Sequence, residues 1–75
     1  MRIRAEENFE KILDLFPNTV EVFERYGFSG LTDPNVRHAA KLVTIQEAAH
    51  LQGVALDQLL RELNRAIGIP ENARV

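Results

Sequence analysis

Apolar residues that recur at spacings of three and four, interrupted by proline and glycine, are the feature that most limits what this 75-residue chain can fold into. Such spacing is typical of amphipathic helices, and the two-residue alternation of a half-buried strand is nearly absent. Helices of about 8–12 residues are unstable alone in water, so they must pack against one another. The pattern therefore predicts an all-α fold, a compact irregular or orthogonal bundle of about five short helices, at about residues 9–16, 19–26, 34–42, 45–52 and 56–67.

Capping residues define the first two helices. Asn8 is a good N-cap for the first, and Pro17 stops it because proline cannot donate the next helical hydrogen bond. Asn18 followed by Glu21 is a variant of the capping box, which predicts that Asn18 caps the second helix. Gly27 is expected to end that helix in a left-handed conformation.

The later helices carry clearer signals. Asp33 is an N-cap residue, and Pro34 follows it at the first helical position, where the missing N–H is harmless. Thr44 and Glu47 have the spacing of a full capping box, and Gly53 is expected to close the fourth helix. These signals predict three separate helices after residue 33.

Helical phase divides each segment into an apolar and a polar face. On the polar side we place Arg37 and His38 of the third helix and Asn64 of the last. The residues predicted to face the core are Phe9, Ile12, Leu13, Phe16, Val20, Val22, Phe23, Tyr26, Val36, Ala39, Ala40, Val43, Ile45, Ala48, Ala49, Leu51, Leu56, Leu59, Leu60, Leu63 and Ile67.

Composition places the chain among small single domains. With 45% apolar residues, residues 1–75 suit one helical domain, of which 70–75 are expected to fray. The absence of cysteine removes disulfides and thiolate metal ligands. The longest apolar run is three residues, 54–56, and no apolar stretch follows Met1, so we expect no membrane span, no secretory signal and a cytoplasmic location.

The charge balance bears on nucleic acid as a partner. Nine Lys and Arg against 11 Asp and Glu give a net charge of −2, which disfavours a phosphate backbone as the main partner. Residues 44–64 nevertheless have the helix, glycine turn, helix layout of a DNA-binding helix-turn-helix. The second helix of that unit has no basic residue before Arg61, so we interpret the unit first as packing and keep DNA binding as an alternative.

Residues suited to catalysis or metal binding are few. No glycine-rich phosphate loop and no cysteine nucleophile occur in the sequence. His38 and His50 are the only imidazoles, twelve residues apart and without the spacing of a zinc motif. We predict a non-catalytic chain without a cofactor or metal site, and we keep small-ligand or metal sensing through His38 or His50 as an alternative.

The loop between the second and third helices is the best candidate interaction surface. Phe28 and Leu31 are large apolar residues for a loop, and they either turn inward to complete the core or form an exposed apolar patch. An exposed aromatic beside an arginine is a common composition of binding hot spots. The candidate surface comprises Phe28, Gly30, Leu31, Asp33, Arg37 and His38.

The ordered set of these residues resembles a known family. Ile3, Pro17, the Tyr26-Gly27-Phe28 segment, Gly53-Val54 and Leu63-Asn64, with their spacings, are similar to the hybrid-cluster-protein-associated redox disulfide domains, over about residues 3–67. The resemblance implies an all-α bundle linked with iron-sulfur repair and nitrogen-oxide metabolism.

In the redox branch of that family a Cys-x-x-Cys pair follows the Tyr-Gly-Phe-like segment. The matching positions here are Gly30 and Asp33, so the redox role does not carry over, and the chain resembles a cysteine-free branch. We therefore predict a module that binds a protein partner or a second copy of itself.

Overall fold

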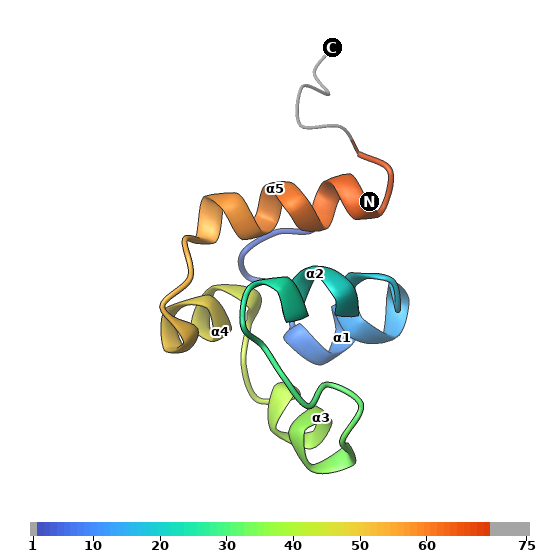
Figure 1. Ribbon diagram of the computed structural model, residues 1–75, viewed down its shortest axis with the longest axis vertical. Helices are drawn as coiled ribbons and strands as arrows, with labels where there is room; N and C mark the ends of the chain where they lie inside the picture. Colours follow the sequence, from blue (N-terminus) through green and yellow to red (C-terminus); the bar gives the residue numbers. More distant parts are fainter. Residues whose placement is uncertain (1, 70–75) are drawn as a thin grey trace.

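The computed structural model describes residues 2–69, which form five helices and no strand. They are α1 (Phe9–Leu15), α2 (Thr19–Arg25), α3 (Pro34–Ala40), α4 (Ile45–Gln52) and α5 (Leu56–Ala66). Figure 1 shows α5 lying across one end of the bundle, α1 and α2 in the middle and α3 at the far end. The all-α prediction is thus confirmed, and the predicted tail 70–75 lies outside the described residues.

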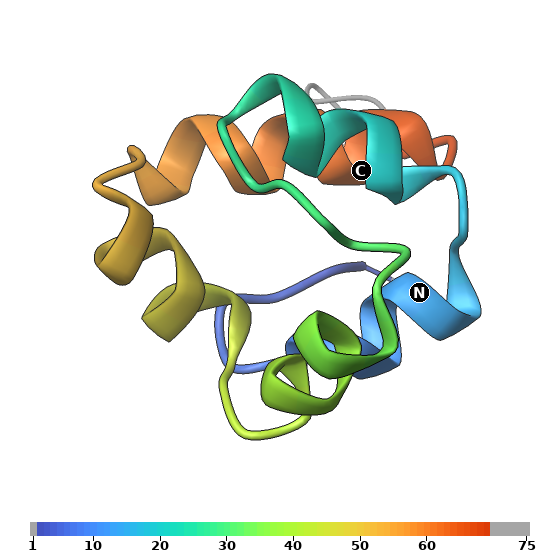
Figure 2. The same ribbon diagram turned by 60° about the horizontal axis from the view of Figure 1, so that its bottom comes forward.

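The helices run in different directions around a shared core. α5 packs against α2 and α4, and α1 packs against α2 and α3. Seen from below, α3 lies on the side of the molecule opposite α2 and α5, and α4 lies between them at the left (Figure 2). The largest fully buried side chains of the described residues are Phe23, Ile3, Ile12, Leu13, Ile45, Leu59, Leu63, Val22 and Thr19.

Most capping predictions are confirmed. The Asn8 side chain accepts from the Lys11 N–H, the Asp33 side chain accepts from the Asn35 N–H, and Thr44 with Glu47 forms the complete capping box. Each cap satisfies N–H groups that would otherwise lack a partner at a helix start.

The capping prediction for Asn18 is wrong. Its backbone is already helical (φ −67°, ψ −14°), and its side chain makes no cap hydrogen bond. The turn before α2 is closed by backbone bonds such as the Thr19 N–H to the Phe16 carbonyl (2.9 Å), so no side-chain cap is needed. The Asn18 amide instead donates to the Ala66 carbonyl (2.8 Å) and ties the start of α2 to the end of α5.

The N-terminal segment, residues 2–5, runs along α5 (Figure 1). The Ile3 N–H donates to Asn64 Oδ1 (2.7 Å), and Asn64 Nδ2 donates to the Ile3 carbonyl (3.0 Å). Asn64 is 5% exposed, so its predicted place on the polar face of the last helix is wrong. α5 is covered by the N-terminal segment as well as by α2 and α4, which widens its buried arc.

Candidate interaction surface

Two apolar residues of the loop before α3 turn inward. Leu31 is 3% exposed and belongs to the core. The half-buried Phe28 ring stands edge-on to the rings of Phe9 and Phe23, with centroids 5.4 and 5.5 Å away. Such edge-to-face contacts are favourable beyond the area they bury. The inward alternative for Phe28 and Leu31 therefore holds, and the exposed patch proposed for this loop is not formed.

Gly30 and Asp33, at the positions matched to the redox cysteines, are exposed and have local structural roles. Gly30 adopts a positive φ of +71°, and a Cβ built there lies 3.3 Å from Val36 Cγ2. Any side chain at this position is strained, because L residues rarely adopt that backbone conformation. Asp33 caps α3, with its Oδ1 2.8 Å from the Asn35 nitrogen.

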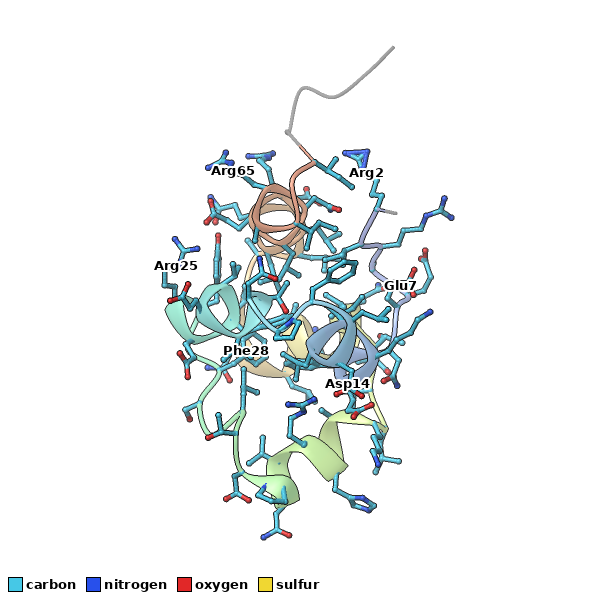
Figure 3. The ribbon with its side chains drawn as sticks, turned by 90° about the vertical axis from the view of Figure 1, so that its right-hand side faces the viewer. Arg2, Glu7, Asp14, Arg25, Phe28 and Arg65 are labelled. Atoms are coloured by element: carbon cyan, nitrogen blue, oxygen red, sulfur yellow. The ribbon has the colours of Figure 1, made fainter. Side chains whose placement is uncertain are left out.

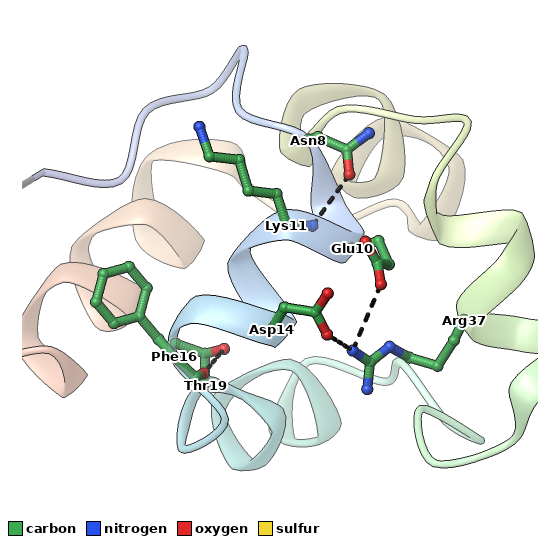
Figure 4. A network of polar contacts seen from close by, with 7 residues as sticks. All are labelled: Asn8, Glu10, Lys11, Asp14, Phe16, Thr19 and Arg37. Atoms are coloured by element: carbon green, nitrogen blue, oxygen red, sulfur yellow. Dashed lines mark hydrogen bonds and ion pairs between the residues drawn. The ribbon is translucent and has the colours of Figure 1, made fainter.

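Arg37 joins α3 to α1 and does not extend into solvent as the sequence predicted. Its guanidinium nitrogen Nη2 lies 2.5 Å from Asp14 Oδ1 and 3.9 Å from Glu10 Oε2 (Figure 4). The Arg37 side chain is 28% exposed and its Nε is buried without a hydrogen-bond partner among the described residues. His38 is exposed on the same helix, as expected. These two residues therefore do not frame an apolar patch with Phe28.

An apolar hollow of about 310 Å³ opens between the loop before α3, α3 itself and α4. We call it the α3–α4 hollow. None of the twelve residues that line it has an ionisable side chain, whereas 27% of the chain is charged. Its lining includes Phe28, Val36, Ala39, Val43 and Leu51.

Two residues predicted to be buried are exposed at this hollow. Ala39 of α3 is exposed, and Leu51 of α4 is 78% exposed. Both lie on the apolar stripe of their helices, as the sequence predicted, but no other described element covers that part of the stripe. Periodicity tells which face of a helix is apolar and does not tell whether a neighbour within the chain covers it.

Leu51 also forms part of a second hollow, of about 560 Å³, on α4 and the turn that follows it. His50, Val54 and Leu56 line this second hollow with Leu51. Leu51 is therefore an exposed apolar side chain shared by two adjoining concave surfaces. The Leu51 side chain therefore projects between the two hollows.

The histidines do not meet in the structure. His38 is on α3 and His50 is on α4, and both are exposed. Within residues 2–69 no three His, Cys, Asp or Glu side chains are placed to hold a metal ion together. The same residues include no helix with the length and apolar character needed to traverse a bilayer.

The helix, turn, helix unit of α4 and α5 is present as a packing unit. Gly53 adopts a left-handed conformation (φ +73°) between the helices, and the Val54 N–H donates to the Ala49 carbonyl (2.9 Å). α5 buries Leu59 and Leu63 against its neighbours. Glu62, on the same helix, pairs with Arg25 at 3.4 Å and with Arg65 at 3.3 Å.

Comparison with known proteins identifies one family. A family model described as a domain of unknown function (DUF1858) matches residues 3–60, which is most of the chain. No curated protein matches the sequence, and no solved structure matches it.

Proposed function

The chain belongs to the DUF1858 family, and we propose that it is a non-catalytic module that associates with a second copy of itself through the α3–α4 hollow. The observation that carries this proposal is Leu51, which is 78% exposed and lines a hollow without ionisable side chains. In a two-fold dimer Leu51 of each copy enters the hollow of the other, because such an interface pairs the same patch of both subunits.

The uncovered apolar stripe supports this role. Ala39 and Leu51 lie at positions whose helical phase matches the buried core, yet both contact solvent in the single chain. A domain of about this size buries only roughly 60% of its unfolded surface, so an added subunit is a common source of stability. Covering the stripe with a second copy removes the exposed apolar surface.

The charge distribution supports a second copy as the occupant. A two-fold interface brings each residue near its own equivalent, so charged residues at its centre repel one another. The lining of the α3–α4 hollow has no ionisable side chain, and the same face therefore meets itself without that repulsion.

The volume of the α3–α4 hollow favours side chains of a second copy over a cofactor as its occupant. Small-molecule sites are typically about 300–1,000 Å³ and enclose most of their ligand. At about 310 Å³ the α3–α4 hollow is at the lower limit of that range. A few aliphatic side chains fill such a space.

The remaining sequence predictions belong to the same proposal. We keep the cytoplasm as the location of the module, because no secretory signal follows Met1 in the sequence, and we keep the cysteine-free branch of the redox disulfide family as its relationship within DUF1858. Links to iron-sulfur or nitrogen-oxide metabolism depend on that relationship.

Sedimentation equilibrium over a protein concentration of about 10 μM to 1 mM tests self-association, because weak interfaces dissociate in that range. We expect a reversible monomer–dimer equilibrium for the wild type. Leu51→Gln should weaken the dimer by about fivefold or more, as expected for a central interface residue. Leu51 is largely exposed in the monomer, so the thermal unfolding of the variant should show a monomer that still folds.

Leu15→Gln is the matched control. Leu15 is 52% exposed at the end of α1 and lines neither hollow, so this change should leave the equilibrium as it is in the wild type. A wild type that stays monomeric throughout contradicts the proposal. Equal weakening by the two variants also contradicts it, because general surface hydrophobicity then explains the association.

A further inference from the structure

The charged residues of this acidic chain are strongly segregated. Four arginines and two carboxylates lie on α5 and the N-terminal segment, a net charge of +2 on that side. The other described residues carry four basic and eight acidic groups, a net charge of −4. The overall charge of −2 therefore conceals a basic surface at one end. The six charged residues of that surface are Arg2, Arg4, Asp57, Arg61, Glu62 and Arg65.

Part of this surface is concave. A hollow of about 430 Å³ lies between the N-terminal segment and α5, and we call it the arginine hollow. Arg2, Arg4 and Arg61 line it together with one carboxylate, that of Asp57. Leu60, which is half-buried, supplies apolar surface beside these charges. The hollow thus combines three guanidinium groups with an apolar wall.

The backbone that positions two of these arginines is firmly held. Ile3 is buried between the exposed Arg2 and Arg4, and both polar groups of its backbone are bonded to the buried Asn64. Alternation of buried and exposed residues directs the two flanking side chains away from the core. Within the described residues neither Arg2 nor Arg4 forms an ion pair, so both guanidinium groups are available to a ligand.

We propose that the arginine hollow binds a phosphate monoester, carried either by a small molecule or by a phosphorylated side chain. A monoester dianion has three terminal oxygens, which accept from several guanidinium groups at once, and arginine matches this planar geometry better than lysine. Leu60 then contacts the carbon chain that bears the phosphate. This site is independent of the α3–α4 hollow and does not depend on self-association.

A monoester fits the hollow better than a nucleic acid backbone does. Asp57 lines the same hollow, and Glu62 lies between Arg25 and Arg65 on the next part of the surface. These carboxylates interrupt any extended basic track of the kind that nucleic acid binding needs. The arginine hollow instead gathers three arginines against one carboxylate within a single concave site.

Amide NMR spectra titrated with inorganic phosphate, glycerol 3-phosphate and a phosphoserine peptide test the site at constant ionic strength. We expect shifts confined to residues of the arginine hollow, such as Ile3, Ala5 and Leu60. Arg4→Gln should weaken binding of all three probes by about tenfold, because a charge-assisted contact is lost. Tighter binding of the peptide identifies a protein source of the phosphate, and tighter binding of glycerol 3-phosphate identifies a small molecule.

Arg25→Gln is the matched control, since it removes the same charge from the same end of the molecule. Figure 3 shows Arg25 and Arg2 on opposite sides of α5, and Arg25 pairs with Glu62 outside the hollow. This variant should bind the probes as the wild type does. Equal weakening by Arg25→Gln, shifts spread over the whole surface, or tighter binding of a random DNA duplex than of any monoester overturns the proposal.

Discussion

The α5 end and the α3 end of the molecule are held by different kinds of contact. α5 buries Leu59 and Leu63 completely and bonds the N-terminal segment through the buried Asn64. Within α3, all of whose residues are described, Ala40 is the one buried side chain. α3 is joined to α1 by the ion pairs of Arg37 with Asp14 and Glu10, which Figure 4 shows, and its end is bonded to the cap of α1 by the Asn8 amide.

The two kinds of contact contribute unequally to the free energy of unfolding. Apolar burial and buried hydrogen bonds contribute several kcal/mol each when disrupted, whereas exposed ion pairs contribute about 0–1 kcal/mol. The α5 end is therefore expected to unfold with the whole domain and the α3 end to open locally. Both proposed sites follow from this contrast: the arginine hollow lies on the firmly held end, and the α3–α4 hollow lies beside the loosely held helix.

The largest effect is expected from Leu63→Ala in the α5 end. Leu63 is fully buried, and truncating such a leucine costs about 2–5 kcal/mol through lost burial and the cavity that remains. Denaturant unfolding followed by circular dichroism measures the change in the free energy of unfolding. Leu15→Ala, at an exposed site, should cost much less, and equal losses would contradict the contrast between the ends.

The next largest effect is expected from Asn64→Ala. This change leaves the buried N–H and carbonyl of Ile3 without partners, at about 1–3 kcal/mol for each group. Hydrogen exchange at Ile3 should accelerate with the loss of global stability. Asn18→Ala removes an exposed bond to Ala66 and should cost less than Asn64→Ala, and the reverse order would show that the N-terminal segment is not anchored as described.

The sequence predicts the helices well because their boundaries depend on local chemistry. α1 ends one residue before the predicted end, since Pro17 restricts Phe16, whose backbone leaves the helical region (φ −133°, ψ 77°). α3 ends at Ala40, two residues early, because the N–H groups of Lys41 and Leu42 bond only three residues back, as in a turn.

The candidate surface could not be predicted from the sequence because it depends on which helices cover one another. Ala39 and Leu51 lie on apolar stripes like those of buried residues, and nothing local marks them as uncovered. Asn64 and Arg37 are polar, so the sequence predicts that they are exposed. In the structure Asn64 bonds the distant backbone of Ile3, and Arg37 pairs with Asp14 on another helix. These long-range partners are set by the packing of the whole chain.

A smaller and local effect is expected from Asp33→Ala. The change removes the N-cap of α3, typically about 1 kcal/mol. Because α3 is held loosely, amide exchange should accelerate at Asn35 and its neighbours while core amides such as that of Leu63 change little. Thr44→Ala, which removes the cap of the core-bearing α4, should accelerate exchange at both places. Identical exchange patterns in the two variants would contradict local opening of α3.

The smallest effect is expected from Arg37→Gln. The ion pairs of Arg37 are partly exposed, with 28% of its own side chain and 59% of that of Asp14 accessible, so solvent screening limits their value to about 0–1 kcal/mol. The change also removes the buried Nε that lacks a partner, which offsets part of the loss. A double-mutant cycle with Asp14→Asn should give a coupling energy below about 1 kcal/mol that falls as salt is added. A coupling of several kcal/mol that salt does not change would mean that the ion pair between Arg37 and Asp14 is effectively buried, and that α3 is as firmly held as α5.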